Sequence, residues 1–508
     1  MSKNISFFKH ESIRDNLKII NRSSALFLIK YSKKDNIYTD FHFLNYWLIK
    51  GNLKNVKIKI TVRNLDGKKI LSNIFFINDL KSYCVKLEKL LLKRNIQNFT
   101  GTGEIEIFSK KNLFFPYPAV YARYHGKNWH AGTHSTTRYF STTSGDDLNL
   151  INKKMHCNES NISLLPKKGV KCFIVLHNGF KKTSNSNIKL TITNHLGENI
   201  KKNLKNFKMK IGETKIICID DYINYKDFLG GNRGMLTVNY STTGVFPRVL
   251  YYNQDTEGKI CLEHSNFGLN KNSSADSFKP KKNSKNLLYT IPIMPKNYKT
   301  EVDFFPTYPN QKSSYIIKVR KNSLKGRNLA FKTIELSKKN PYGQLSETAS
   351  KETTFLDIDI TNKDKLPNRF HIAQYYSKNE SLPGIVLDGP LPCSTQGVRT
   401  RWTPFFTKGE KLKSKIYICS RNFDKNSASK KIEVNILLIG GLKKEKIEII
   451  KTLNSKENFI LNVSKIIKKN KWKSDFGWAY IKFKEPSHNT VFFVSDYGKN
   501  SVVSNHAF

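Results

Sequence analysis

Short runs that alternate apolar and polar residues recur along the whole chain. One run starts as Gly-Met-Leu-Thr-Val-Asn-Tyr at Gly234, and similar runs start at Gly103 and Gly477. A period of two residues is typical of a β-strand with one buried face, because successive side chains point to opposite sides of the sheet. Isoleucine, valine, threonine and tyrosine are frequent in these runs, and Asn, Gly and Asp turns separate them. The pattern predicts an all-β protein built from antiparallel sheets.

Each of these runs belongs to a longer segment that returns along the chain. The segment reads as a strand, a short helix, a glycine, a strand, a turn and a further strand, and its clear copies are 85–124, 215–252 and 458–498. Their spacing, and that of an eroded copy between them, is roughly 120 to 135 residues, which is the length of one β-sandwich domain. The chain has 508 residues, too many for one hydrophobic core. We therefore predict four tandem β-sandwich modules, at 1–143, 144–270, 271–394 and 395–508.

The short helix in each copy predicts a capped corner between two strands. Asp220, Ser464 and Glu88 put an oxygen atom where each helix begins, and such an oxygen accepts hydrogen bonds from the amides of the first turn. This arrangement resembles the E–F corner of immunoglobulin-like sandwiches, most closely over residues 474–480, and the likeness covers about twenty residues per module. The paired cysteines and core tryptophan of antibody domains are missing, so the resemblance implies topology and no activity.

The third module keeps the repeated pattern least clearly. Its opening glycine is replaced near Asn368 and Arg369, although strand-like runs occur at 315–320, 329–335, 355–360, 370–376 and 385–388. Segments rich in Asn, Ser, Lys, Gly or Pro predict linkers between the modules, at 141–147, 270–285 and 390–397.

Positive charge is the second strong feature of the sequence. Lysine and arginine number 87 against 40 acidic residues, for a formal charge of +47. Charge of this size favours binding to polyanions such as acidic polysaccharide, nucleic acid or an anionic membrane surface. An AT-rich coding sequence would also produce this excess, since lysine accompanies abundant asparagine and isoleucine, so both origins stay open. No helix-turn-helix, zinc-finger or RNP-like pattern accompanies the charge. A nucleic-acid-associated protein recruited by charge is therefore the third of the three functions that we consider.

The seven cysteines indicate the redox compartment. They are odd in number, have no C-x-x-C spacing, and several interrupt apolar strand runs, which predicts buried reduced thiols. A bond from Cys172 to Cys218 or Cys261 is the alternative within the second module. The first residues lack an apolar core of signal-peptide length, and no run of about 18 apolar residues follows. At face value we expect a cytoplasmic protein without a transmembrane segment, and leaderless export to the cell surface stays open.

Candidate chemistry gathers after the last clear strand run of the first module, in residues 121–135, which we expect to form an exposed loop that is free to vary. Three histidines follow one another at spacings of five and four residues, and aromatic and arginine side chains lie among them: Tyr121, Arg123, Tyr124, His125, Trp129, His130 and His134. Such residues favour a structural role, a ligand or glycan contact, or nitrogen ligation of a divalent ion. His134 and His264 stand at nearly the same offset within their modules, which favours the structural role. We expect no cofactor and keep His125, His130 and His134 as weak metal candidates.

Two further patterns point to ligand chemistry. Asp357 and Asp359 alternate with apolar residues, so both carboxylates lie on one face of a strand about 6 to 7 Å apart. This separation suits acid and base chemistry on a sugar, and it also fits the acidic outer positions of a half-exposed strand. Arg401 and Trp402 place a guanidinium group beside an aromatic ring, which suits carboxylate, sulfate or phosphate groups.

These features predict a non-enzymatic β-sandwich protein for binding or assembly, with an anionic polysaccharide, a cell-surface glycan or a partner protein as its ligand. Phosphate-binding loops, zinc-protease motifs and nucleophile elbows are missing from the sequence, which lowers the odds of catalysis. The alternative is a glycan-acting enzyme, a hydrolase or an acyl-group-modifying enzyme, with a histidine-rich site in the first module that acts either with or without a metal ion. The candidate ligand-binding residues are Tyr121, Arg123, Tyr124, His125, Trp129, His130, His134, His264, Arg401 and Trp402.

Overall fold

The computed structural model describes most of the chain between Arg22 and His506. The described residues are 22–108, 120–134, 138–139, 154–179, 181–243, 245–246, 248–268, 286–295, 297–306, 314–337, 339–340, 342–348, 352–362, 370–378, 382–388, 391–392, 400–407, 412–421, 431–485, 487–497 and 502–506. Strands dominate them, and the helices among them are short. No helix in these ranges has the length and apolar character needed to cross a membrane.

Two antiparallel sheets form the first module. The outer sheet has the order β1 (Arg22–Ser32), β6 (Asn98–Phe108), β3 (Val56–Asn64) and β4 (Lys69–Ile77). The inner sheet has the order β5 (Ser82–Lys86), β2 (Tyr38–Leu44), β7 (Val120–His125) and β8 (His130–Thr133). Helix α3 (Tyr46–Gly51) follows β2, and α4 (Leu87–Leu92) follows β5. Buried apolar side chains of both sheets share one core, so the two sheets pack as a sandwich.

The other three modules repeat this strand order. In the second, β10 (Lys154–Leu164), β15 (Gly234–Thr243), β12 (Thr183–Thr193) and β13 (Asn199–Met209) form the outer sheet, which β19 (Asn266–Gly268) extends. Its inner sheet is β14 (Thr214–Cys218), β11 (Lys171–His177), β17 (Leu250–Gln254) and β18 (Ile260–His264). Helices η1 (Ile219–Asp221) and α6 (Tyr225–Leu229) follow β14. A small sheet joins β16 (Val245–Phe246) to β9 (Arg138–Tyr139), which precedes this module.

The outer sheet of the third module is β20 (Asn286–Ile293), β25 (Thr354–Asn362), β22 (Tyr315–Asn322) and β23 (Asn328–Leu336), with β28 (Leu391–Pro392) beside β20. Its inner sheet is β24 (Gly343–Thr348), β21 (Lys299–Pro306), β26 (Phe370–Ser377) and β27 (Gly384–Asp388). The fourth module has an outer sheet of β29 (Thr400–Phe406), β34 (Phe476–Phe483), β31 (Ile432–Gly440) and β32 (Lys446–Leu453). Its inner sheet is β33 (Asn458–Asn462), β30 (Leu412–Arg421), β35 (His488–Tyr497) and β36 (Val502–His506), and α7 (Val463–Lys469) follows β33. The predicted all-β fold of antiparallel sandwiches is confirmed.

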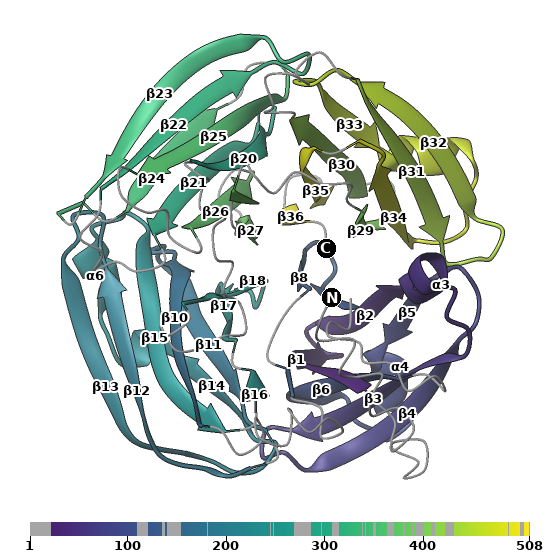
Figure 1. The fold of residues 1–508 in the computed structure, drawn as a ribbon. Helices are drawn as coiled ribbons and strands as arrows, with labels where there is room; N and C mark the ends of the chain where they lie inside the picture. The colour runs from purple at the N-terminus through teal and green to yellow at the C-terminus, as the bar shows by residue number, and fades with distance from the viewer. Residues whose placement is uncertain are drawn as a thin grey trace, which may run out of the picture.

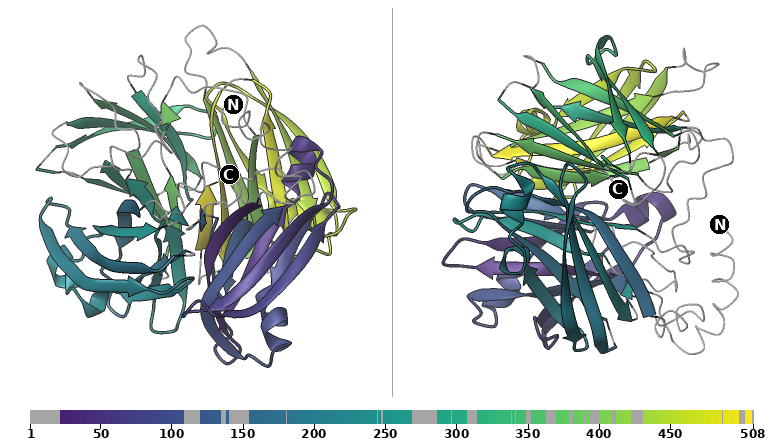
Figure 2. Two further views of the ribbon diagram at one scale, coloured as in Figure 1. Left: turned by 60° about the horizontal axis from the view of Figure 1, so that its bottom comes forward. Right: turned by 90° about the vertical axis from the view of Figure 1, so that its left-hand side faces the viewer.

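The four sandwiches form a closed ring, with the last strand of each inner sheet at the centre (Figure 1). Strand β8 contacts β18 and β36, and β27 contacts the same two strands, so the contacts close around the ring. The first module, in purple, lies beside the last, in yellow, in every view that shows both (Figures 1 and 2). Each hydrophobic core also extends into the next module, through Leu250 of the second, Tyr375 of the third, Phe492 of the fourth and Tyr121 of the first.

Neighbouring modules meet head to tail, and the same parts of the fold recur at the contacts. The turn after β3 offers the carbonyl of Leu65 to the amide of Thr214, which opens β14, at 2.8 Å. The equivalent turn of the third module offers the carbonyl of Leu324 to the amide of Asn458, which opens β33, at 2.9 Å. A repeated head-to-tail contact makes a ring when its rotation closes. Here it closes after four modules of one chain.

The repeated glycine in the first module is Gly101, and the predicted equivalence of Gly103 is wrong. Gly477 pairs with Gly440, and Gly101 pairs with Asn64. Gly440 and Asn64 occupy the same place, because the amide of each closes the turn that follows its strand, at 2.7 and 3.0 Å. The alternating run of the first module extends two residues further back than the sequence pattern suggested, since β6 already begins at Asn98.

Close approach of the neighbouring strand explains why glycine is needed there. A Cβ atom on Gly101 would lie 2.2 Å from the carbonyl oxygen of Arg63, and one on Gly477 would lie 2.6 Å from that of Ile439. Both distances are far below van der Waals contact, so a side chain would push the strands apart.

The third module keeps all five predicted strands but not the predicted position of the missing glycine. The amide of Ser323 bonds to the carbonyl of Arg327 at 2.8 Å and closes the equivalent turn, and the preceding Asn322 pairs with Phe355. The equivalent of the glycine is therefore Thr354, the first residue of β25. Asn368 and Arg369, where the sequence pattern placed it, lie outside the described residues.

The predicted helix caps act differently from the expectation. Neither η1 nor α4 has a side-chain cap, and α7 is capped by Asn462, whose side chain accepts from the amide of Lys465 at 3.1 Å. Asp220 and Ser464 instead accept the amides of Cys172 and Ser414 on the adjacent strand, both at 2.8 Å. These oxygens therefore fasten the corner to the sheet, one residue beyond the last pair of β11 with β14 and of β30 with β33.

The cysteines of the described residues carry free thiols. Cys172 and Cys261 are buried, Cys218 is half-buried, and no bond links Cys172 to either of them. Cys84 and Cys419 are free as well. Side chains of Cys157 and Cys393 lie outside the described part of the structure.

Candidate functional site

The histidine-rich segment of the first module is not an exposed loop. Residues 120–125 and 130–133 form β7 and β8 of the inner sheet. Trp129 and His130 are only 7% and 2% exposed, and Tyr121 and Tyr124 are fully buried. The expectation of an exposed, freely varying loop is wrong. These residues form strands of the inner sheet, Tyr124 and Trp129 belong to a core cluster built mainly of first-module residues, and β18 and β36 of the neighbouring modules contact β8.

Three of the candidates meet the fourth module. Tyr121 packs its ring against Phe406 and Phe493, with centroid distances of 5.9 and 5.7 Å. The guanidinium of Arg123 lies 4.4 Å from the centroid of Phe406. His130 places Nε2 at 3.4 Å from the carbonyl oxygen of Ser495, and burial holds its pKa well below the ordinary value. These contacts build the interface between the first and last modules.

The other candidates lie apart from that interface. Tyr124 donates to the carbonyl of Leu28 at 2.7 Å within its own sandwich. His125 is half-buried, and its Nε2 lies 2.9 Å from a carboxylate oxygen of Asp40. Arg401 donates to the side chain of Asn489 at 3.2 Å within the fourth module. Trp402, its neighbour on β29, is half-buried against the core of that module.

The paired carboxylates of β25 have structural partners. Asp357 accepts from Arg421 of the fourth module at 3.0 Å and from Asn322 at 2.8 Å. Asp359 lies 3.8 Å from Arg320, and burial raises its pKa. The two carboxylates therefore do different jobs, and Asp357 joins the third module to the fourth.

A small pocket beside the first module holds Asp40, His42 and Cys84. Its volume is about 270 Å3, and the thiol of Cys84 lies 3.8 Å from Nε2 of His42. Burial raises the pKa of Cys84 well above the ordinary value and lowers that of His42 to about 3. Cysteine catalysis needs a thiolate, usually stabilised by a histidinium. This environment favours the neutral thiol and the neutral imidazole, so it does not activate Cys84.

Three equivalent strand positions converge at the centre of the ring. Thr133, Glu263 and Asn505 lie opposite Ala122, Tyr251 and Phe493 in their own sheets. Glu263 has no exposed surface, and it accepts from the hydroxyl of Thr133 at 3.0 Å and from the amide of Asn505 at 3.5 Å. The sequence contained one indication of this cluster, the shared offset of His134 and His264 within their modules. That indication pointed to the histidines and did not predict Thr133, Glu263 or Asn505.

His134 and His264 follow two of these positions and belong to the same cluster. Their rings meet edge to face with centroids 4.9 Å apart, and both side chains are buried. Nε2 of His264 lies 3.4 Å from the carboxylate of Glu263. We call Thr133, His134, Glu263, His264 and Asn505 the central cluster. It brings together residues of the first, second and fourth modules.

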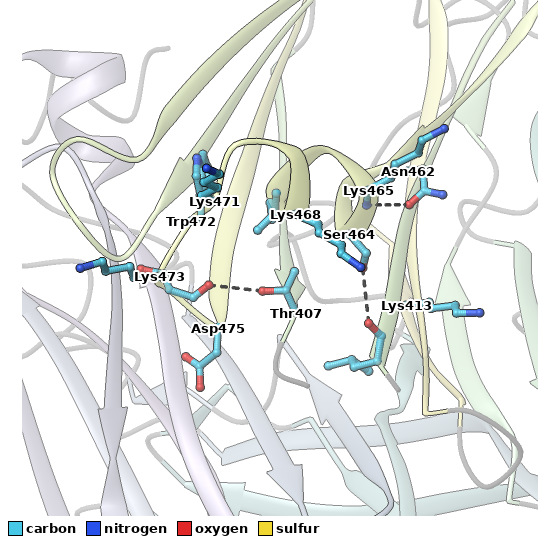
Figure 3. A pocket seen from close by; sticks show the side chains of 13 residues that line it. Thr407, Lys413, Asn462, Ser464, Lys465, Lys468, Lys471, Trp472, Lys473 and Asp475 are labelled. Atoms are coloured by element: carbon cyan, nitrogen blue, oxygen red, sulfur yellow. Dashed lines mark hydrogen bonds between the residues drawn. The ribbon is translucent and has the colours of Figure 1, made fainter. Parts of the chain in front are cut away.

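A second hollow lies on the fourth module, beside α7. It encloses about 940 Å3, and its lining includes Lys413, Lys465, Lys468, Lys471 and Lys473. Figure 3 shows Lys413 and Lys465 at one end and Lys473 at the other. All five lysine side chains are exposed, and no ion pair joins them to a carboxylate of the described residues. We call this hollow the lysine pocket.

Local structure holds the lysine pocket in shape. On α7, Val463 and Ile467 are buried, so Lys465 and Lys468, one helical turn apart, face away from the core. Ser464 donates to the carbonyl of Leu412 at 3.4 Å, and this bond ties the helix to β30 (Figure 3).

The segment after the helix is fixed as well. The amide of Thr407 donates to the carbonyl of Asp475 at 2.9 Å, and its hydroxyl donates to the carbonyl of Ser474 at 3.4 Å. Trp472 is half-buried, with its ring centroid 6.4 Å from that of Phe405. Among the described lining residues, Asp475 is the one carboxylate. The pocket therefore combines a concave, ordered backbone with excess positive charge.

Comparison with known proteins leaves the function open. No protein-family model matches the sequence, and no curated protein matches it. Among solved structures, a glycosyl hydrolase family 2 member from Bacteroides cellulosilyticus is similar at 10% identity, over 49% of this chain and 30% of that one, with a TM-score of 0.12. A β-glucuronidase from Bacteroides uniformis is similar at 9% identity, over 49% and 26% of the two chains, with a TM-score of 0.11.

An α-2-macroglobulin from Escherichia coli is similar at 6% identity, over 90% of this chain and 36% of that one, also with a TM-score of 0.11. This chain thus spans about a third or less of the length of the first two structures. TM-scores of 0.12 and 0.11 do not indicate that the whole chains superimpose. The fold rests on the sheets of the chain itself.

Proposed function

We propose that this protein is a non-catalytic ring of β-sandwiches that binds an anionic polysaccharide in the lysine pocket of its fourth module. The observation that carries the proposal is the set of five exposed lysines around one concave surface with a single lining carboxylate. Clustered ammonium groups with no acidic partner create a positive potential that attracts sulfate and carboxylate groups.

The size and lining of the pocket suit a ligand of one or two charged sugar units better than they suit a partner with a large, flat surface. Its volume of about 940 Å3 lies within the range of about 300 to 1,000 Å3 typical of ligand sites. The half-buried indole of Trp472 supplies an apolar surface on which a sugar ring packs, and Ser464 and Asn462 supply polar groups at the other end. Lysine is a point charge on a flexible stem, so the pocket selects for charge more than for one fixed geometry.

Two other readings have less support. The catalytic alternative lacks an activated group in the first module, since Cys84 and His42 stay neutral and Asp40 is paired with His125. The nucleic-acid alternative lacks a row of stacking aromatic residues along the lysine pocket, where Trp472 is the one aromatic lining residue described.

The test compares probes by charge and by class. Fluorescence titration of the full chain with heparin, neutral dextran and single-stranded DNA of similar length separates the readings. We expect heparin to bind, dextran to show no binding at the same concentration, and added salt to weaken the heparin complex steeply. Equal binding of dextran would contradict the charge-based proposal. Binding of DNA at least ten times tighter than heparin would favour the nucleic-acid reading instead.

A further inference from the structure

The central cluster contains a set of side chains with the chemistry of a metal site. The nearest ligand atoms of His134, Glu263 and His264 all lie within 4.8 Å of one another. The three side chains are 6%, 0% and 3% exposed. Two imidazoles and one carboxylate form a frequent ligand set for zinc and for other divalent first-row metals. The set is shared between two modules, since His134 follows β8 and the other two residues end β18.

The hydrogen bonding of His264 decides which nitrogen faces the cluster. Its Nδ1 lies 3.1 Å from the carbonyl oxygen of Ser265, which only accepts, so Nδ1 carries the hydrogen. Nε2 then points its lone pair toward Oε1 of Glu263, 3.4 Å away. Oε1 also accepts from the hydroxyl of Thr133 at 3.0 Å and from the amide of His264 at 2.9 Å, and these bonds fix its orientation. A cation beside both atoms, either a metal ion or a proton on Nε2, stabilises the basic nitrogen and the buried carboxylate together.

The distance between these two atoms fits a metal ion. Two ligand atoms bonded at about 2.1 Å to one tetrahedral zinc ion lie about 3.4 Å apart. A direct hydrogen bond from a charged imidazole to a carboxylate is shorter, about 2.7 to 2.9 Å. The separation of 3.4 Å between Nε2 of His264 and Oε1 of Glu263 matches the first arrangement.

The surrounding hydrogen bonds are those that orient metal ligands. Metal-binding histidines usually donate the second ring nitrogen to a carbonyl or carboxylate, as His264 does to Ser265. Metal-binding carboxylates are themselves hydrogen-bonded, as Glu263 is to Thr133 and Asn505. These donors come from the first and fourth modules, so the carboxylate is oriented only when the ring is closed.

We propose that His134, Glu263 and His264 bind one divalent cation, zinc by the chemistry of the donors, at the centre of the ring. The ion links the first module to the second and places a positive charge beside the buried carboxylate of Glu263. Three protein ligands leave a further coordination position. The burial of all three ligands favours a structural ion that stabilises the closed ring.

The test measures metal content and thermal stability of the untagged full chain. Elemental analysis of protein purified without chelator is expected to find about one zinc ion per chain. Removal of the ion with a chelator should lower Tm by several degrees, and added Zn2+ alone should restore it, because an ion that binds only the folded state stabilises that state. Metal-free wild-type protein whose Tm does not respond to Zn2+, Co2+ or Mn2+ would overturn the proposal and leave a proton on His264.

Conservative variants assign the ligands without requiring a large cavity. E263Q and H134N should each reduce zinc content at least tenfold, while H177N and E104Q, which change a buried histidine and a buried glutamate elsewhere, should keep it. If a variant does not fold, the visible absorption of Co2+ bound to wild-type protein still reports whether nitrogen and oxygen ligands surround the ion tetrahedrally. Zinc kept by E263Q and H134N but lost by C84A would place the ion at Asp40, His42 and Cys84 and would refute the proposal.

Discussion

Ser82 in the first module donates a 2.7 Å hydrogen bond to the carbonyl oxygen of Ile439 in the last module, 357 residues further along the chain. This buried bond lies where the ring closes. The shared apolar cores make the same connection, since Leu44 and Tyr121 of the first module pack into the core of the fourth. Closure therefore depends on the first and last modules meeting in the same way as neighbours in sequence.

Removal of the hydroxyl that makes this bond should weaken the ring. We expect Ser82→Ala to lower the free energy of unfolding by about 1 to 2 kcal/mol, because the carbonyl of Ile439 loses a buried donor. The matched control, Ser32→Ala, removes a hydroxyl bonded to Asp35 at an exposed turn and should change the same free energy by about 0.5 kcal/mol or less. Urea denaturation followed by tryptophan fluorescence measures both. Equal effects of the two substitutions would show that ring closure adds no stability.

A buried ion pair should hold the second module to the third. Arg233 donates to both oxygens of Asp303, at 2.9 and 2.7 Å, and Asp303 has no exposed surface. Asp303→Asn leaves the arginine underpaired and should cost about 3 to 5 kcal/mol in urea denaturation. Glu301→Gln removes the more exposed partner of the same arginine and should cost clearly less. A loss below about 1 kcal/mol for Asp303→Asn would mean that water reaches this interface.

Comparison of the sequence with the structure shows which physical signals are local. The alternating runs predicted the sandwiches, because a strand with one buried face produces an apolar and polar alternation among residues that are neighbours in the sequence. The run after Gly101 was aligned two positions late, since a period of two permits a shift that keeps every side chain on its face.

The candidate sites depended on contacts that no local pattern contains. The pairing of Thr133 with Glu263 joins residues 130 positions apart, and it exists only because the ring closes. The same closure buries His130 against the fourth module, and Trp129 is buried in a core cluster built mainly of first-module residues, although the sequence favoured both as exposed. The one sequence feature that points to the lysine pocket is the spacing of Lys465 and Lys468, which puts both on one helix face. Similar lysine runs occur in many other segments, so this spacing did not single out the pocket.

Acid should destabilise the protein through buried histidines. Burial lowers the pKa of His42 and of His177 to about 3, whereas both have an ordinary pKa near 6.5 in the unfolded chain. Below about pH 6.5 the unfolded chain therefore binds protons that the folded chain does not. Stability present above pH 6.5 should fall by about 1.4 kcal/mol per pH unit for each such histidine as the pH drops toward 3.

Urea denaturation between pH 7 and pH 4 measures this loss, and His177→Asn isolates one histidine. The variant should show a shallower decline than wild-type protein. An identical pH dependence would mean that His177 takes up its proton in the folded state.

A half-buried lysine should extend the same trend, a stability that rises with pH, into the alkaline range. Burial lowers the pKa of Lys30 to about 8, although its ammonium group bonds to Gln254 at 2.9 Å and lies 4.2 Å from the centroid of Tyr252. Between pH 8 and pH 10.5 the unfolded chain binds more protons than the folded chain. Burial of the charged lysine therefore lowers the free energy of unfolding by its full amount below pH 8, and this destabilisation disappears as the pH rises to 10.5.

Lys30→Met removes the charge and keeps most of the packing. We expect the variant to be more stable than wild-type protein by about 1 to 3 kcal/mol at pH 7, since a shift from 10.5 to about 8 corresponds to about 3 kcal/mol before the lost contacts are subtracted. This gain should shrink toward pH 10.5. Exposed Lys33→Met is the control, and a gain that is the same at both pH values would rule out the charge as its cause.

The binding of heparin by two triple variants of equal charge tests the central claim most directly. K465Q/K468Q/K471Q removes three charges from the lysine pocket, and K201Q/K202Q/K205Q removes three exposed charges from β13. We predict that the pocket variant binds heparin at least about tenfold more weakly than wild-type protein, a loss of about 1.4 kcal/mol or more, while the β13 variant stays within about twofold. Equal weakening of both variants, with unchanged Tm, would show that attraction comes from the overall charge and would contradict a binding site in the lysine pocket.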